Sequence, residues 1–130
     1  MSKLFSKILV AVDGSDHADK AFERAIFLAQ NFNSDLEIIT VIHDSTESLK
    51  TKGEELLEKY KQRAIDFNLR AQSLLKIGDP AQKIMETAEK NNSELIIVGS
   101  RGLGLFKDLL VGSVSHKVSQ HAKCPVMMVR

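Results

Sequence analysis

Short apolar runs alternate with stretches of helical periodicity along this 130-residue chain, and this alternation constrains the fold more than any other feature. Residues 8–12 are continuously apolar, as is typical of a strand that is buried on both faces, and residues 95–98 form another short apolar run that predicts a strand. The stretches between such runs carry apolar residues at helical spacing, for example Ala21, Phe22, Ala25, Ile26 and Ala29. Regular alternation of strand and helix predicts an α/β fold, a doubly wound five-stranded parallel sheet with helices on both faces.

Two further strands have the character of sheet edges. Residues 69–77 alternate between apolar and polar side chains, which suits a half-exposed edge strand. Pro125 lacks an N–H group and directly precedes the apolar residues 126–129, which again favours an edge position. Together with residues 36–42, an apolar and β-branched run, these segments complete five predicted strands.

Local signals mark the starts of the helices. Ser15 is a predicted N-cap, and Asp79 followed by Pro80 is a second clear helix start. Residues 47–67 have helical periodicity, but Gly53 weakens the first half of that helix because glycine is a poor helix former.

Glycines are concentrated between residues 99 and 112, which hold four of the seven in the chain. Gly99 follows the apolar run 95–98, and Ser113 precedes a helix-like stretch over residues 114–122. A strand end, a glycine-rich turn and a helix start together present free N–H groups and a positive dipole end, which suit a phosphate. The alternative is a surface loop that needs glycine only for turning.

At these residues the chain resembles the universal stress protein family, in its nucleotide-binding branch. That branch carries the pattern G-x2-G-x9-G-[ST], which Gly99, Gly102, Gly112 and Ser113 match without a gap. Residues 7–15 look like the family's first strand and turn, and residues 124–129 look like its last strand. The resemblance implies one domain over residues 1–130, with strand order 3-2-1-4-5.

The resemblance also implies a site for the adenosine part of a nucleotide at Ala11, Asp13 and Val41. Many nucleotide-binding members carry proline at the position of Ala11. Asp13 ends the first predicted strand and can accept hydrogen bonds from ribose hydroxyls, or it is a solvated turn aspartate. If the first and fourth strands are neighbours, Asp13 and Gly99 flank one crevice at the carboxyl ends of the strands.

The phosphates are expected at the glycine-rich segment. Backbone N–H groups and the Ser113 hydroxyl would hold them, although Ser113 can also serve as a helix cap. Arg101 and Lys107 are close enough in sequence to offer charge, but solvated surface cations are the commoner case. The predicted phosphate-side residues are Gly99, Arg101, Gly102, Leu103, Gly112, Ser113, Val114 and Ser115.

Other site types find little support. The segment lacks the Gly-Lys-[Ser/Thr] triplet of a Walker P-loop and the third glycine of a dinucleotide fingerprint. The four histidines are not at the spacing of zinc ligands, and no nucleophile with an adjacent base is visible. Cys124 is interpreted as a small buried hydrophobic residue. No catalytic residue and no metal ligand are predicted.

Composition limits the classes of partner and the cellular compartment that we expect for this chain. With 18 basic and 17 acidic residues the net charge is +1, so no nucleic-acid partner is expected. The apolar runs are far shorter than the roughly 20 residues that span a bilayer, so no membrane association is expected. One cysteine and an N-terminus that runs straight into strand-like sequence favour the cytoplasm.

These observations lead to three hypotheses. The first is a regulatory protein that binds ATP or a close adenine nucleotide, with Mg²⁺ left open as a companion of the phosphates. It would form a homodimer through its last strand, as family members commonly do. The second is a slow ATPase or phosphotransferase, and the third is a dimeric scaffold without nucleotide. The residues of the expected dimer contact are Val126, Met127, Met128 and Val129.

Overall fold

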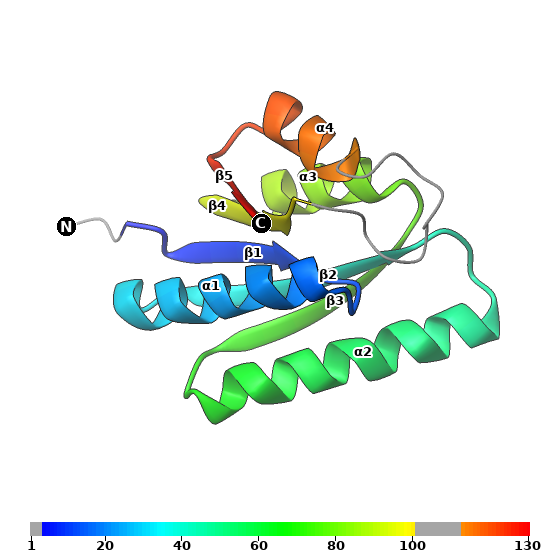
Figure 1. Cartoon of the computed structure of the whole chain (residues 1–130), viewed down its shortest axis with the longest axis horizontal. Coiled ribbons are helices and arrows are strands. Elements are labelled where there is room, and N and C mark those ends of the chain that lie inside the picture. Colours follow the sequence, from blue (N-terminus) through cyan, green and yellow to red (C-terminus); the bar gives the residue numbers. More distant parts are fainter. Residues whose placement is uncertain (1–3, 101–112) are drawn as a thin grey trace.

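The fold is built on a parallel sheet whose strands lie in the order β3-β2-β1-β4-β5 (Figure 1). The structure is a computed structural model that describes residues 4–100 and 113–130. All neighbouring strands run parallel, which confirms the predicted doubly wound α/β fold. The elements are β1 (Lys7–Ala11), α1 (Asp16–Phe32), β2 (Asp35–Ile42), α2 (Glu47–Asp66), β3 (Ala71–Ile77), α3 (Pro80–Lys90), β4 (Leu95–Gly99), α4 (Ser113–His121) and β5 (Val126–Val129).

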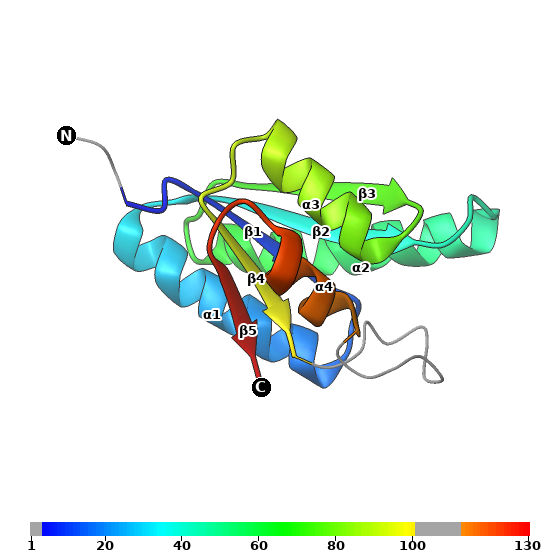
Figure 2. The ribbon, with the colours of Figure 1, turned by 90° about the horizontal axis from the view of Figure 1, so that it is seen from above.

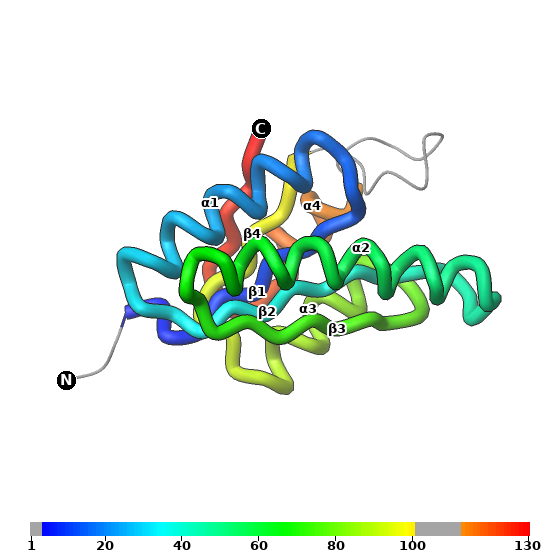
Figure 3. Tube along the Cα trace, turned by 90° about the horizontal axis from the view of Figure 1, so that it is seen from below, coloured from blue at the N-terminus to red at the C-terminus, as the bar shows by residue number. Residues whose placement is uncertain are grey.

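The helices form two layers around the sheet. Helices α1 and α2 cover one face, and α3 and α4 cover the other (Figures 1 and 2). Figure 3 shows the α1–α2 layer from its own side. Each face holds an apolar cluster, one built around Phe22 and Ile38 and the other around Ile84 and Ile96. The central strands β1 and β4 contribute to both clusters, which is why their sequences are continuously apolar.

The edge strands lie where the sequence predicts them, with one difference in detail. Strand β3 is at one edge and β5 at the other. The alternation in residues 69–77 places Ile77 on the apolar side, yet Ile77 ends β3 and is 41% exposed. Leu74, on the opposite side of β3, packs instead against the α3–α4 cluster. Strand β3 is therefore partly buried on both faces.

The predicted helix starts are confirmed. The Ser15 hydroxyl accepts a hydrogen bond from the Ala18 N–H at 3.1 Å, and the Asp79 carboxylate accepts one from the Gln82 N–H at 3.0 Å. Helix α2 continues through Gly53 without a break. A Cβ on that residue would lie 2.8 Å from Cδ1 of Leu75. Glycine therefore allows α2 to pack closely on β3, a contact that local helix propensity does not reveal.

Candidate functional site

The carboxyl ends of β1 and β4 lie side by side, with Val10 paired to Ile97. The winding of the sheet reverses between these two strands, because β2 and β3 lie beyond β1 whereas β5 lies beyond β4. In open α/β sheets ligands bind at this place. The turn after β1 and the chain after β4 therefore form the candidate site, as the sequence predicts.

The turn after β1 is held by short-range contacts. Asp13 is half-buried, and its Oδ1 accepts a hydrogen bond from the Ser15 N–H at 2.9 Å. Gly14 has a φ of +85°, a conformation that other residues rarely adopt. A Cβ on Gly14 would lie 3.3 Å from Cδ1 of Leu56, so α2 also limits what fits in this turn. Asp13 therefore has a structural role in the turn, whatever else its carboxylate binds.

Of the residues predicted to hold adenosine, Asp13 and Val41 lie level with each other at the ends of adjacent strands, and Ala11 lies two residues before them. Ala11 pairs with Ile39 across β1 and β2, and Asp13 and Val41 each lie two residues further along. Ala11 is buried and Val41 is half-buried, both against the α3–α4 cluster, to which Val114 also packs. The structure thus brings Ala11, Val41 and the start of α4 to the same face at the same edge.

The first turn of α4 is attached to the chain that leaves β4. The Ser115 hydroxyl donates to the Ser100 carbonyl at 3.4 Å, and the Ser100 N–H donates to the Val129 carbonyl at 2.8 Å. Ser113 is the first residue of α4. The N-terminus of α4 therefore lies close to the end of β4. The predicted residues Arg101, Gly102, Leu103, Lys107 and Gly112 lie outside the described residues.

Gly99 has a packing role that the sequence does not reveal. A Cβ at this position would lie 2.9 Å from the carbonyl carbon, the carbonyl oxygen and the Cβ of His17. Real Cβ atoms essentially never approach so closely, so only glycine fits between β4 and the first turn of α1. The sequence suggests nucleotide binding or a tight turn as the reason for Gly99, whereas the structure shows a packing reason for glycine here.

His17 is a candidate site residue that sequence reasoning missed. Its Nδ1 is buried and has no hydrogen-bond partner among the residues that the structure describes. The spacing of the histidines bears only on metal binding, and the one sequence signal for His17 is its position just after the capping Ser15. A buried ring nitrogen at this edge can donate to or accept from a bound group.

A polar cluster joins α1 and α2 beside the site. The Tyr60 hydroxyl donates to Oδ1 of Asp19, and Nη1 of Arg63 lies 3.8 Å from the same oxygen. Burial raises the pKa of Tyr60 well above its usual value, and the hydrogen bond and charge of Asp19 raise it further. The charge of Asp13 adds a smaller contribution in the same direction, so Tyr60 lies within electrostatic reach of the candidate site.

Residues 4–100 and 113–130 offer neither a metal-binding cluster nor a membrane-spanning helix. This part of the chain holds no group of three or more His, Cys, Asp or Glu side chains that could bind a metal ion. It also contains no helix with the length and apolar character needed to cross a bilayer. Cys124 is half-buried against the α3–α4 cluster, and burial raises the pKa of its thiol.

Comparison with known proteins identifies the family. Residues 4–130 match the model of the universal stress protein family. The chain is 35% identical to universal stress protein YxiE of Bacillus subtilis, covering 98% of this chain and all of the relative. It is 33% identical to universal stress protein MJ0531 of Methanocaldococcus jannaschii, covering 98% and 83%. A universal stress protein solved in complex with cAMP superposes with a TM-score of 0.81 at 26% identity, covering 98% of both chains. The chain therefore belongs to the universal stress protein family.

Proposed function

We propose that this protein binds an adenine nucleotide, ATP in the first place, at the carboxyl ends of β1 and β4. The observation that carries the proposal is the convergence of the Asp13 turn and the N-terminus of α4 where the sheet winding reverses. The similar universal stress protein solved with cAMP supports an adenine nucleotide as the ligand.

The adenosine part would lie over the ends of β1 and β2. In this proposal Asp13 accepts hydrogen bonds from the ribose hydroxyls, while the backbone of Val41 meets the adenine edge. Ala11, buried below them, shapes the floor of the site. These roles agree with the register of β1 and β2, in which Asp13 is level with Val41 and Ala11 lies two residues before them.

The phosphates would lie at the start of α4. A helix N-terminus carries unpaired N–H groups and a partial positive charge, both of which favour an anion. The N–H groups of Gly102, Gly112, Ser113 and Val114 would hold the phosphates, with Arg101 and Lys107 supplying charge. Gly99, Leu103 and Ser115 complete the proposed site, and Mg²⁺ would accompany the phosphates rather than occupy a site of protein ligands.

We further propose that the protein is a cytoplasmic homodimer that pairs through the free edge of β5. This strand lies at the end of the sheet, and Met128 is 50% exposed on it. An exposed apolar edge strand readily pairs with another chain. The role would be regulatory, because nucleotide occupancy at the start of α4 changes a surface that a partner can contact.

Two measurements test the ligand. Acid extraction of the purified protein followed by mass spectrometry is expected to release an adenine nucleotide, and calorimetry of the emptied protein is expected to show heat with ATP. Asp13→Ala should weaken ATP binding by about tenfold, the loss expected when hydrogen bonds to a charged acceptor are removed. Asp16→Ala is the matched control, because it removes the same charge from an exposed position three residues along.

The alternatives give different results. Steady phosphate release from ATP would favour the slow ATPase or phosphotransferase. An empty extract together with no heat on adding ATP would contradict nucleotide binding and favour the dimeric scaffold. Equal losses of ATP affinity in Asp13→Ala and Asp16→Ala would contradict the proposed role of the Asp13 carboxylate, but they would not contradict nucleotide binding itself.

A further inference from the structure

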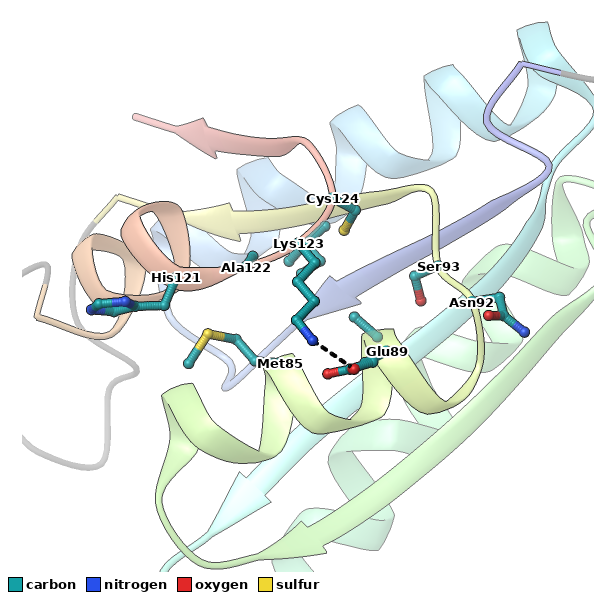
Figure 4. A pocket seen from close by; sticks show the side chains of 10 residues that line it. Met85, Glu89, Asn92, Ser93, His121, Ala122, Lys123 and Cys124 are labelled. Atoms are coloured by element: carbon teal, nitrogen blue, oxygen red, sulfur yellow. Dashed lines mark hydrogen bonds and ion pairs between the residues drawn. The ribbon is translucent and has the colours of Figure 1, made fainter.

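A cavity of about 230 Å³ lies between the C-terminal ends of α3 and α4 (Figure 4). Its lining includes Ser93 and Ile96, at the amino end of β4. The proposed nucleotide site lies at the carboxyl ends, on the opposite edge of the sheet. Among the residues that the structure describes, none of those predicted for nucleotide binding lines this cavity. It is therefore a separate space, to which the proposed function assigns no role.

Part of the cavity wall is apolar and contains two sulfur atoms, whereas Glu89, Asn92, His121 and Lys123 line the rest. Ala88 and Ile96 are buried in the α3–α4 cluster, and Met85, Ala122 and Cys124 pack partly against it. Figure 4 shows the Met85 and Cys124 side chains coming from α3 and from the loop before β5. Sulfur makes favourable contacts with aromatic rings, which gives this wall a preference for an aromatic over an aliphatic occupant.

One polar group in the lining lacks a partner. Ser93 is 8% exposed, and its hydroxyl is buried without a hydrogen-bond partner among the described residues. Its own N–H is already used, since it donates to the Ala88 carbonyl at 2.8 Å. Buried hydroxyls are nearly always hydrogen-bonded, so this group points to a bound molecule that can donate to it or accept from it.

The charges around the cavity are paired with each other at its mouth. The Lys123 ammonium lies 2.9 Å from Oε1 of Glu89, and both side chains are largely exposed. Burial raises the pKa of the Cys124 thiol, so the sulfur in the wall is uncharged at neutral pH. A charged group placed against the apolar wall of Ala88, Ile96 and Ala122 would lose hydration without gaining a partner there, so an uncharged occupant is favoured on that wall.

We propose that this cavity binds a small uncharged aromatic molecule that carries one hydroxyl or N–H group. The ring would lie against the wall that contains Met85 and Cys124, and the polar group would bond to the Ser93 hydroxyl. The size agrees, since a cavity of roughly 150 Å³ holds benzene and drug-sized ligands need about 300 Å³ or more. Phenol and indole fall within this range and are suitable probes.

Amide correlation NMR of the full chain tests the proposal, with phenol, indole and benzene as probes. Phenol and indole are expected to cause saturable shifts centred on Ser93, Ile96 and Cys124. Phenol should bind about fivefold more tightly than benzene, the ratio expected for one neutral hydrogen bond. Ser93→Ala should abolish this preference and leave benzene binding unchanged. Ser73→Ala, a half-buried serine on β3, is the matched control and should change nothing.

A second variant tests the location. Ala122→Leu adds bulk to the half-buried cavity wall and should weaken all three probes by about tenfold or more, while amide shifts away from the cavity report an intact fold. No saturable shift up to the solubility of phenol, or shifts centred elsewhere, would overturn the proposal. A preference for phenol over benzene that persists in Ser93→Ala would also overturn the proposal, because the Ser93 hydroxyl would then not be the group that binds the phenol hydroxyl.

Discussion

Gly99 and His17 are in direct contact through their backbones, since a Cβ at position 99 would lie 2.9 Å from the His17 carbonyl carbon and oxygen. Backbone atoms cannot move aside as a side-chain end can. Gly99→Ala is therefore expected to lower the free energy of unfolding by about 1–3 kcal/mol, the usual cost of overpacking a well-packed site. Urea denaturation followed by circular dichroism measures this change.

Gly53→Ala is the matched control for this substitution. Its Cβ would lie 2.8 Å from Leu75 Cδ1, which is the end of a flexible side chain on an edge strand. Alanine also favours the helix by about 1 kcal/mol over glycine, so the net change is expected to stay within about 1 kcal/mol. If Gly99→Ala costs no more than Gly53→Ala, the tight contact between β4 and α1 is wrong.

Tyr60 should ionise only at a pH far above the usual range for tyrosine. Burial is the main cause of its raised pKa, followed by the hydrogen bond and charge of Asp19. The chain holds one tyrosine and no tryptophan, so tyrosinate absorbance in the near ultraviolet follows this single group. Tyr60 of the folded protein is expected to titrate at a clearly higher pH than in the urea-unfolded chain, where tyrosine ionises at about pH 10.

The same shift links Tyr60 to stability. Because its folded pKa lies above the unfolded value, its contribution is fully present below the unfolded pKa and is lost as the pH rises through the folded pKa. Asp19→Asn should lower the folded pKa part of the way, since burial remains. Coincident titration curves for folded and unfolded chains would contradict the raised pKa, and a folded pKa that is unchanged in Asp19→Asn would contradict the contribution of the contact between Tyr60 and Asp19.

Glu37 should make the stability depend on pH in the weakly acidic range. Burial raises the pKa of its carboxyl group, although the Asn91 hydrogen bond at 2.9 Å and the charge of Lys7 oppose the shift. Its contribution is therefore present below the unfolded pKa and is lost as the pH rises through the folded pKa. Glu37→Gln should gain stability relative to the parent as the pH rises through this window, measured by urea denaturation at a series of pH values. A constant difference between the two proteins would exclude the shift.

Met128→Lys should convert the proposed dimer into a monomer. Met128 is 50% exposed on the free edge strand β5, and a charge placed there opposes edge pairing. Light scattering at micromolar concentration is expected to give half the molar mass of the parent protein. Ile65→Lys, which changes a residue that is 44% exposed on α2, should leave the mass unchanged. A parent protein that is already monomeric would rule out the β5 dimer.

The sequence alone determined the elements and their local signals. The continuously apolar residues 8–12 predicted a strand buried on both faces and residues 95–98 predicted a further strand, and both strands lie in the middle of the sheet. Ser15 and Asp79 predicted the starts of α1 and α3, because a cap depends only on residues two or three positions away. Strand–helix alternation likewise predicted the doubly wound fold, while the strand order followed from the family resemblance.

Only the tertiary structure decided which distant residues meet. It placed His17 against Gly99 and Leu75 against Gly53, so both glycines have packing roles. Local propensity alone indicates only a turn at Gly99 and a weakened helix at Gly53. It also left the Ser93 hydroxyl in a cavity between two helix ends. These contacts depend on how helices cross the sheet, and a periodic pattern shows which face is apolar without showing how closely two faces approach.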